Sequence, residues 1–254
     1  MTTVTSSEPG SFCWIELGTS DANGARAFYT QLFGWDVAEF PMGENEGMYT
    51  IFRKGGRDVS GMYQVGPAQG GMPPNWASYV AATNVDESAE KAKSLGGNVM
   101  MPPFDVFDMG RMTFITDPQG AMLGLWQSKS HTGVGVFGES NTLCWNELQA
   151  RDVEVAKQFY AALFGWRYKG SPDYTEVHIG DRGIGGIMAS KAPPEVPSFW
   201  MPYFAVDDCD ATFAKAQSLG ASAHVPPTDI PDVGRFSVLV DPQGAAFATI
   251  QVKM

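Results

Sequence analysis

Basic residues are scarce in this chain of 254 residues. Its 17 Lys and Arg are outnumbered by 28 Asp and Glu, so the formal net charge at pH 7 is −11. Contact with nucleic acid or with an anionic membrane surface normally requires clustered Lys and Arg. No stretch approaches the roughly 18 consecutive apolar residues of a membrane-spanning helix. We therefore expect neither a nucleic-acid partner nor a membrane partner.

Cysteine and histidine are also rare, with three residues of each. The cysteines Cys13, Cys144 and Cys209 form no C-x-x-C pair, and an odd number suits a reduced compartment better than a disulfide framework. Residues 1–11 are rich in Thr and Ser and lack the basic start and apolar run of a secretory signal. These features predict a cytoplasmic protein with a disordered tail over residues 1–11.

Several catalytic signatures are missing as well. The sequence has no Gly-x-Ser-x-Gly elbow, no Gly-x-x-x-x-Gly-Lys-Ser/Thr phosphate loop and no dinucleotide fingerprint after a strand. What the chain does contain is 44% hydrophobic and 12% aromatic residues, which is enough for a packed globular protein. The chemistry of such a chain must come from side chains that the fold brings together.

The chain repeats itself. The segment from Cys13 to Trp35 recurs 131 residues later, and the segment from Trp76 to Gln127 recurs 124 residues later, so the second copy has a loop shorter by seven residues. The match includes the Trp-x-Glu-Leu, Phe-Tyr and Leu-Phe-Gly-Trp groups of the first segment and the Asp-Pro-Gln-Gly of the second. We therefore predict two homologous domains, residues 12–129 and 142–254, joined by a linker over residues 130–141.

Each half also divides into two similar units. Residues 13–17 alternate as in a strand, and Asp21 stands where an N-cap belongs, ahead of apolar residues at helical spacing that end at Gly34. Short runs with Gly-Gly turns then predict antiparallel strands. The same order begins again at Trp76, with a helix predicted from about Asp86 to Leu95. The predicted unit is β-α-β-β-β, present four times, in an α+β fold.

These motifs resemble the vicinal oxygen chelate superfamily, which includes glyoxalase I, bleomycin resistance proteins and extradiol dioxygenases. The resemblance rests on the Asp before an Ala-x-x-Phe-Tyr-x-x-Leu-Phe-Gly helix and on the Asp-Pro-x-Gly turn, and it covers residues 12–127 and 143–252. It is closest to a two-domain actinobacterial subgroup of glyoxalase-like proteins, some of which are named as hydroxylases. The resemblance implies tandem glyoxalase-like domains, each an incomplete mixed β-barrel of two units flanked by helices. Which units share a barrel stays open.

The resemblance also implies where metal ligands would stand. Metal-dependent members place them on inward-facing strand positions, which correspond here to the six residues Trp14, Ala77, Gly124, Trp145, Met201 and Ala248. None of these side chains can bind a divalent cation of the usual kinds. Glu16 and Glu147, two residues further along their strands, are the remaining carboxylates on that face. We therefore expect no metal and no other cofactor.

Strand alternation predicts which side chains face each cavity. Large aromatic and Met side chains, with one carboxylate per domain, favour a flat, hydrophobic guest. Arg111 and Arg235, at matched positions, are the expected ion-pair partners of Glu16 and Glu147; alternatively, a buried Glu16 with a raised pKa serves as a general base. The predicted binding residues are Trp14, Glu16, Trp76, Tyr79, Met122, Trp126, Trp145, Glu147, Met201, Tyr203 and Arg235.

Three functions fit these features. The first is metal-independent binding of a small hydrophobic or aromatic metabolite or antibiotic, by a monomer or a homodimer. The second is a metal-free tailoring enzyme of secondary metabolism, such as a hydroxylase, hydratase or isomerase, with Glu16 as the base and Arg111 or a Tyr stabilising an oxyanion. The third, a glyoxalase-type lyase, is suggested by the resemblance and opposed by the residues at the ligand positions.

Overall fold

The computed structural model describes residues 7–43, 47–66, 71–171 and 173–253. Within these residues, seventeen strands form two mixed sheets, which four helices accompany. The α+β class and the tandem arrangement of β-α-β-β-β units are confirmed. No helix of the described part is long and apolar enough to cross a membrane.

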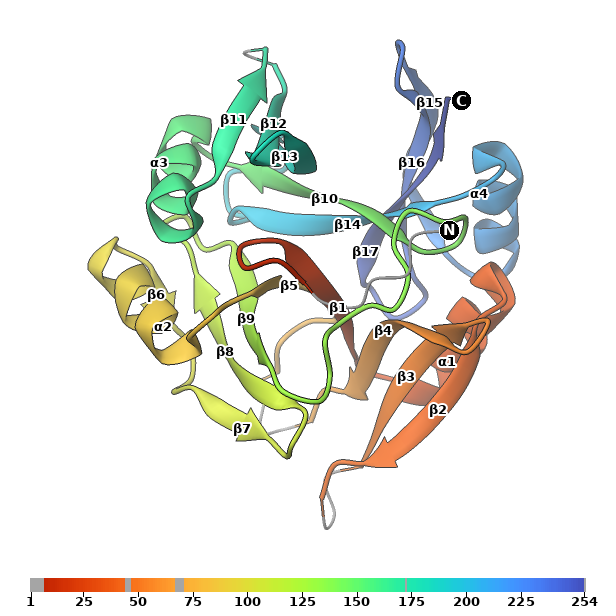
Figure 1. The fold of residues 1–254 in the computed structure, drawn as a ribbon. Coiled ribbons are helices and arrows are strands. Elements are labelled where there is room, and N and C mark those ends of the chain that lie inside the picture. The colour runs from red at the N-terminus through yellow and green to blue at the C-terminus, as the bar shows by residue number, and fades with distance from the viewer. Residues whose placement is uncertain (1–6, 44–46, 67–70, 172, 254) are drawn as a thin grey trace.

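The first sheet joins two consecutive units and curls into a half-barrel (Figure 1). Its strand order is β2-β3-β4-β1-β5-β9-β8-β6, with β7 pairing β8, and the two units meet where β1 runs antiparallel to β5. Units that follow one another in the chain therefore share a sheet. The strands are β1 (Phe12–Thr19), β2 (Asp36–Pro41), β3 (Met48–Lys54), β4 (Arg57–Gln64), β5 (Asn75–Ala81), β6 (Asn98–Val99), β7 (Phe104–Val106), β8 (Gly110–Thr116) and β9 (Met122–Ser128).

The second sheet repeats this order as β11-β12-β13-β10-β14-β17-β16-β15. Its two central strands, β10 and β14, are antiparallel like their counterparts in the first sheet. The strands are β10 (Leu143–Ala150), β11 (Arg167–Gly170), β12 (Thr175–Ile179), β13 (Arg182–Ala189), β14 (Phe199–Ala205), β15 (Ser222–Ile230), β16 (Gly234–Val240) and β17 (Ala246–Val252).

The helix signals of the sequence are confirmed at both ends. The Asp21 side chain accepts a hydrogen bond from the Gly24 backbone N–H, and Gly34 ends the helix in the left-handed conformation at φ 70°. Asp152 and Gly165 do the same in the second copy. The helices are α1 (Ala22–Phe33), α2 (Val85–Ser94), α3 (Val153–Phe164) and α4 (Cys209–Ser218).

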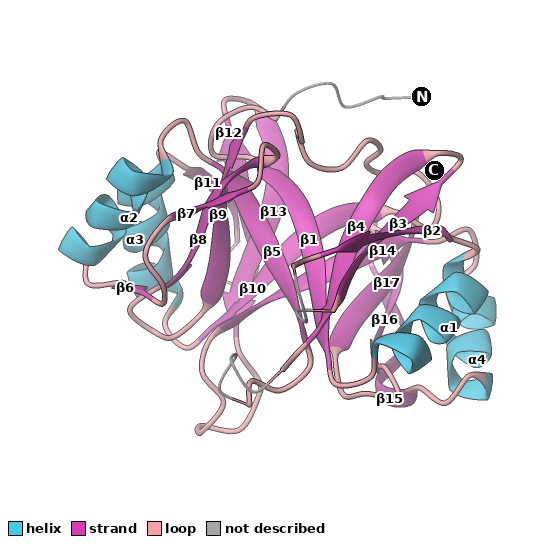
Figure 2. Ribbon diagram, turned by 90° about the horizontal axis from the view of Figure 1, so that it is seen from below, coloured by secondary structure: helices cyan, strands magenta, loops and turns pink. Residues whose placement is uncertain are grey.

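The two sheets lie back to back, and the helices fill the space on either side of this contact. The Ser78 hydroxyl of β5 donates to the Asn146 side chain of β10 at 2.6 Å, with both residues fully buried. Helix α1 lies beside α4, and α2 beside α3, so each helix pair joins the two halves (Figure 2). Each sheet thus keeps one face free of helices, which we call its inner face.

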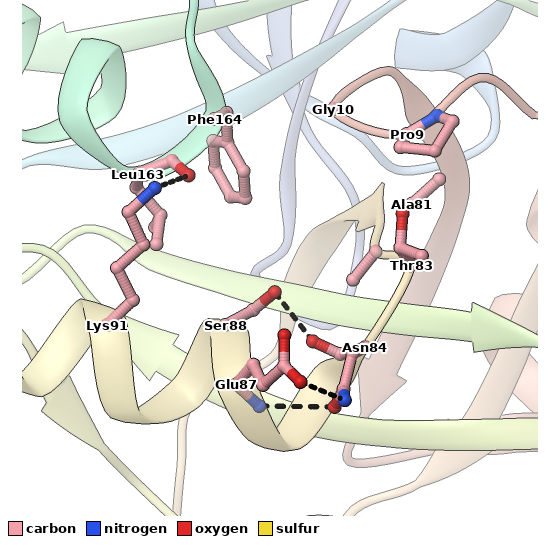
Figure 3. Close-up of a pocket in the computed structure, with 11 residues that line it drawn as sticks. Pro9, Gly10, Ala81, Thr83, Asn84, Glu87, Ser88, Lys91, Leu163 and Phe164 are labelled. Carbon is pink, nitrogen blue, oxygen red and sulfur yellow. Dashed lines mark hydrogen bonds between the residues drawn. The ribbon is translucent and has the colours of Figure 1, made fainter.

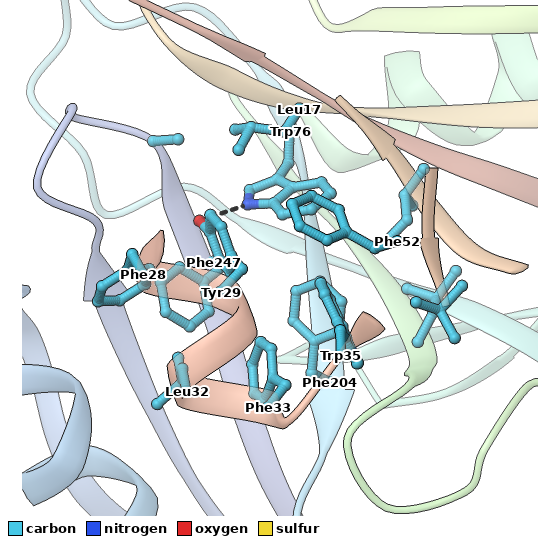
Figure 4. Packing of buried hydrophobic residues seen from close by; sticks show 14 of the residues in the cluster. Leu17, Phe28, Tyr29, Leu32, Phe33, Trp35, Phe52, Trp76, Phe204 and Phe247 are labelled. Carbon is cyan, nitrogen blue, oxygen red and sulfur yellow. Dashed lines mark hydrogen bonds between the residues drawn. The ribbon is translucent and has the colours of Figure 1, made fainter. Parts of the chain in front are cut away.

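The main aromatic core crosses between the halves (Figure 4). Phe33 and Trp35 pack against Phe204 of β14, with ring centroids 5.0 and 5.6 Å apart. Tyr29 packs against Phe247 of β17, and its hydroxyl donates to the Asp241 carboxylate at 2.9 Å. The first and second halves therefore share a core.

The disordered tail predicted over residues 1–11 includes two residues that are ordered, Gly10 and Ser11. Residues 1–6 lie outside the described part, but Gly10 and Ser11 are buried. The Gly10 backbone N–H donates to the Ala81 carbonyl, and the Gly10 carbonyl accepts from the Trp166 indole. These bonds place Gly10 and Ser11 in the ordered structure beside β5 and the second half.

Candidate functional site

The inner face of the first sheet collects most of the predicted binding residues. Backbone register pairs Trp14 with Tyr79, Glu16 with Ala77, and Tyr79 with Gly124, which puts all five residues on one face. Met122 and Trp126 alternate with Gly124 along β9 and join the same apolar cluster. The predicted placement of Trp14, Glu16, Tyr79, Met122 and Trp126 on a common face is confirmed.

Glu16 is the carboxylate of this face. It is 8% exposed, and one of its oxygens accepts a hydrogen bond from the Tyr79 hydroxyl at 2.9 Å. Burial raises the pKa of Glu16 to about 7, whereas hydrogen bonds with Tyr79 and Tyr49 act to lower it. At neutral pH this carboxyl is therefore poised between its acid and its carboxylate forms.

Two further tyrosines surround Glu16 and were missed by the sequence reasoning. The Tyr49 hydroxyl accepts a hydrogen bond from the Trp14 indole at 3.2 Å. Burial and the charge of Glu16 raise the pKa of Tyr63 to about 12. Both residues stand on strands that were predicted, but their facing follows from the pairing of β3 and β4 with β1. Strand alternation puts Tyr49 and Ile51 on one face of their strand, and the pairing of β3 with β4 shows that this face is the inner one.

Glycines make room for these rings. A Cβ on Gly61 would collide with the Tyr49 hydroxyl, and one on Gly124 would collide with the Tyr79 ring. Both glycines belong to strands, at φ values that other residues adopt, so space rather than backbone conformation requires Gly there. The space left by these two glycines is therefore occupied by the Tyr49 hydroxyl and the Tyr79 ring.

Exposed apolar side chains border the first inner face. Phe40 pairs in register with Tyr49, and Phe104 pairs with Met112, so both side chains point to the inner side. In the turn after β7, Phe107 is 69% exposed. The large hydrophobic side chains that are exposed in the described part of this half are Val37, Phe40, Met48, Met100, Met101, Phe104, Phe107 and Met109; those in the other half are Val155, Val233 and Val252.

The inner face of the second sheet carries a modified copy of the Glu16 cluster. The Glu147 carboxylate accepts hydrogen bonds from Tyr203 at 2.8 Å and from the Gln149 amide at 2.6 Å, and the Trp145 indole donates to the Tyr174 hydroxyl at 2.8 Å. Burial raises the pKa of Glu147, against hydrogen bonds that lower it. Met201 lies beside Glu147 in register. Trp145, Glu147, Met201 and Tyr203 are thus placed together as predicted.

The predicted arginine partners are wrong. Arg111 forms ion pairs with Asp86 at 2.7 Å and with Asp105 at 3.6 Å, and Arg235 pairs with Asp210 and Asp229. The reason is strand alternation: Met112 faces inward, so its neighbour Arg111 faces the helix side. Arg235, beside the inward Phe236, does the same. Neither arginine can therefore stabilise an oxyanion or a guest next to a glutamate of the inner faces.

Trp76 is also misplaced in the prediction. It precedes the inward Ala77 and points to the opposite face, where its indole donates to the Tyr29 hydroxyl at 2.9 Å (Figure 4). It packs against Phe204, with ring centroids 5.4 Å apart. Trp76 therefore belongs to the core that joins the two halves and does not line a site.

The residues of the inner faces do not suit a catalytic divalent metal. Trp14, Ala77 and Gly124, which stand at the implied ligand positions, do converge on one face, but their side chains offer no oxygen, imidazole or thiolate donor. Within the described residues, no group of three or more His, Cys, Asp or Glu could hold a metal ion. What the first inner face offers a guest is therefore the chemistry of its aromatic rings, its tyrosine hydroxyls and the Glu16 carboxyl.

Two hollows lie away from the inner faces. One, of about 270 Å³, is bordered by the N-terminal segment, the start of α2 and the end of α3 (Figure 3). Its polar side chains are already hydrogen-bonded: Ser88 donates to the backbone carbonyl of Asn84, and Lys91 donates to that of Leu163. The other hollow is bordered by α3, β11 and Thr175. Neither contains a predicted site residue.

A family model described as "Glyoxalase/Bleomycin resistance protein/Dioxygenase superfamily" matches residues 11–125 and 142–249. Among curated proteins, the "Putative glyoxylase CFP32" of Mycobacterium tuberculosis is 43% identical over 94% of this chain and 93% of its own length. The anthracycline biosynthesis protein DnrV of Streptomyces peucetius is 34% identical over 96% of this chain and 94% of its own length.

Solved structures with the same fold include a manganese-bound glyoxalase and a dioxygenase. The Mn(II)-bound glyoxalase from Novosphingobium aromaticivorans superposes with a TM-score of 0.66 at 14% identity, covering 96% of this chain and 83% of that one. The 2,3-dioxygenase LapB from Pseudomonas sp. KL28 superposes with a TM-score of 0.63 at 13% identity, covering 97% and 94%. At such low identity the likeness establishes the fold alone.

Proposed function

The chain belongs to the glyoxalase/bleomycin resistance protein/dioxygenase superfamily, and on this basis we propose that it binds a small, largely aromatic molecule on the inner face of its first sheet. Binding through the side chains of this face requires no metal. A relative named for anthracycline biosynthesis, at 34% identity over nearly the whole length, fits a guest with fused aromatic rings.

The observation that carries this proposal is the difference between the two inner faces. Ala77 occupies the position that Met201 fills in the second sheet, since each pairs in register with the glutamate of its own face. Gly18 stands where the second sheet has Gln149, and Gly124 where it has Ala248. At these three positions the first face has the smaller side chain, whereas it has the larger one at Trp126, which stands where the second sheet has Ile250.

The border of the first face supports the same conclusion. Exposed apolar side chains are a cost in water unless something covers them, and monomeric proteins rarely gather them at one place without use. Phe40 and Phe104 point to the inner side from opposite edges of the curled sheet. A flat ring system bound there would have the aromatic cluster of the inner face below it and the side chains of Phe40 and Phe104 beside it.

Replacing the small residue Ala77 on the first inner face by a larger one tests the proposal. In the variant Ala77→Met the first face takes the side chain that the second already has, so we expect affinity for the neutral aromatic probe 2-naphthylmethanol, followed by tryptophan fluorescence, to fall at least about tenfold, the loss of roughly 1.4 kcal/mol. Met201→Ala serves as the matched variant of the second face and Arg111→Ala as a helix-side control. Both should bind like the wild type. Unchanged binding by Ala77→Met would contradict the proposal.

A second candidate function is proton transfer by Glu16 in a metal-free tailoring enzyme. The observation that favours it is the Glu16 pKa of about 7, because a general base works best when its pKa lies near the working pH. The Tyr79 hydroxyl, 2.9 Å from the carboxylate, would be the neighbouring proton donor. In that case Glu16→Gln would abolish turnover of a bound polycyclic substrate and leave its affinity nearly unchanged, whereas a binding protein would show no turnover in either form.

A further inference from the structure

Glu16 has no basic partner in the part of the chain that the structure describes. Among the described residues, no Lys, Arg or His forms an ion pair or a hydrogen bond with it; the bonds it accepts come from tyrosine hydroxyls. Arg53 and His131, the basic residues around Asp58, lie 2.7 and 3.7 Å from that carboxylate. A buried carboxylate without a counter-charge costs several kcal/mol. The ionised Glu16 side chain therefore lacks a positive charge to stabilise it.

Tyrosine hydroxyls contact the Glu16 carboxyl, and aromatic rings lie beside it on the same face. The Trp14 indole, held by the Tyr49 hydroxyl, and the Tyr79 ring lie on the same face as Glu16, and the Tyr63 hydroxyl would lie 3.2 Å from a Cβ on Gly18, two residues further along the strand. The faces of aromatic rings attract organic cations, most strongly where water is excluded. Rings and carboxylate together thus match the chemistry of an ammonium group.

The second inner face differs from the first in the hydrogen bonds to its glutamate. There the Gln149 amide donates to Glu147 at 2.6 Å and compensates part of its charge. His178, which is 6% exposed, lies 2.9 Å from Glu176 on neighbouring strand β12. Glu147 thus has one hydrogen-bonding partner more than Glu16, and the second face serves as the internal control for the first.

We propose that the first inner face selects aromatic molecules that carry an ammonium group, which pairs with Glu16 while the rings of Trp14, Tyr49 and Tyr79 enclose it. This inference rests on the proposed binding function and narrows it to a class of ligand. An ammonium guest supplies the missing counter-charge in a site of low dielectric, where the attraction is strong. A neutral guest of the same shape leaves the carboxylate uncompensated, and an anionic guest is repelled.

Three probes of similar size separate charge from shape: 2-naphthylmethylammonium, neutral 2-naphthylmethanol and anionic 2-naphthylacetate. Each is titrated into the full chain at pH 8, where Glu16 is mainly ionised, and binding is followed by tryptophan fluorescence and calorimetry. We expect the ammonium probe to bind at least tenfold more tightly than the alcohol, and the acetate to bind most weakly.

Glu16→Gln and Glu147→Gln are the matched variants. Glu16→Gln keeps an oxygen that accepts from Tyr79 and removes the charge, so it should bring the ammonium and alcohol affinities to within about twofold of each other. Glu147→Gln should keep the tenfold preference. A circular dichroism spectrum like that of the wild type shows that each variant is folded; the wild-type preference is measured independently of both variants.

The outcomes distinguish this inference from the function on which it rests. Equal binding of the ammonium and alcohol probes to the wild type would overturn the charge selection and leave aromatic binding in place. Binding of none of the three probes would overturn both. A preference that is lost in Glu147→Gln and kept in Glu16→Gln would also overturn the inference, because the second face would then be its source.

Discussion

Glu16 is buried, and ionising its carboxyl there costs free energy that apolar packing does not offset. Its carboxyl is surrounded by the phenols of Tyr49, Tyr63 and Tyr79, whose own pKa values are raised by burial, so these phenols stay neutral at physiological pH. Asp58, the next carboxylate on this side, has its pKa lowered by its hydrogen bond with His131 and by Arg53, and it stays ionised. Between pH 5 and 8, Glu16 is therefore the carboxyl of this cluster that changes charge.

Replacing Glu16 should change how stability depends on pH. The unfolded chain ionises this group near its ordinary value of 4.5, whereas the folded chain does so near 7. The folded state binds more protons between these values, so the contribution of Glu16 to stability is full below pH 4.5 and is lost as pH rises through 7. Glu16→Gln, measured by chemical denaturation, should match the wild type near pH 4.5 and exceed it at pH 8 by about 3 kcal/mol.

The exposed Glu90 provides the control for this measurement. The variant Glu90→Gln removes a carboxylate whose side chain is 72% exposed, and its stability should stay within about 0.5 kcal/mol of the wild type at both pH values. If Glu16→Gln behaved in the same flat way, the carboxyl of Glu16 would have an ordinary pKa. The proposed selection of ammonium guests would then lose its electrostatic basis.

At the scale of the strand, two glycines hold equivalent places in the two sheets. Gly61 of β4 pairs in register with Glu16 and leaves room for the Tyr49 hydroxyl; Gly186 of β13 pairs with Glu147 and leaves room for Tyr174. A methyl group at either position would force the tyrosine ring away from its tryptophan partner. The two sites thus allow the same substitution to be made in each sheet.

Gly61→Ala should weaken binding of 2-naphthylmethanol at least about fivefold, because the displaced Tyr49 ring would no longer be held by Trp14. Gly186→Ala should leave this binding unchanged, since it alters the second face. Each variant should lose about 1–3 kcal/mol of stability from overpacking. Fluorescence titration measures the first effect and denaturation the second; an equal loss of binding in both variants would show that the substitution acts through general destabilisation.

Strand alternation accounts for what could be predicted from the sequence at this scale. Trp14, Glu16, Tyr79, Met122 and Trp126 were placed correctly because period-2 alternation follows from covalent geometry. The Glu–Arg pairing failed because it assumed that two oppositely charged residues at matched positions must meet. It ignored that Arg111 follows strand alternation and points to the helix side. There Asp86 of α2 lies 2.7 Å away and pairs with it.

Register between strands could not be predicted in the same way. The inward position of Tyr49 depends on how β3 aligns with β4 and how β4 aligns with β1, which is fixed by long-range hydrogen bonds. The pairing of consecutive units in one sheet likewise stayed open, since four similar units allow more than one arrangement. The sequence repeat predicts the β-α-β-β-β unit, whereas packing between the four units determines which of them share a sheet.

Over the whole molecule, the helices make the two halves dependent on each other. Tyr29 of α1 donates to Asp241 in the second half, and Tyr160 of α3 is hydrogen-bonded to Asp117 in the first at 3.3 Å. Burial raises the pKa of both aspartates, against several hydrogen bonds that lower it. Apolar residues of each half would face water if the other were removed.

The shared core predicts a single unfolding transition. Phe204 of β14 is fully buried against Phe33, Trp35 and Trp76 of the first half, so Phe204→Ala should cost about 3–5 kcal/mol. Because the core is common, backbone amides of both sheets should lose hydrogen-exchange protection together, and fluorescence and circular dichroism should report one midpoint. Phe107→Ala, at a side chain 69% exposed, should shift stability by no more than about 0.5 kcal/mol. Separate midpoints for the two sheets in Phe204→Ala would mean that the halves fold independently despite this contact.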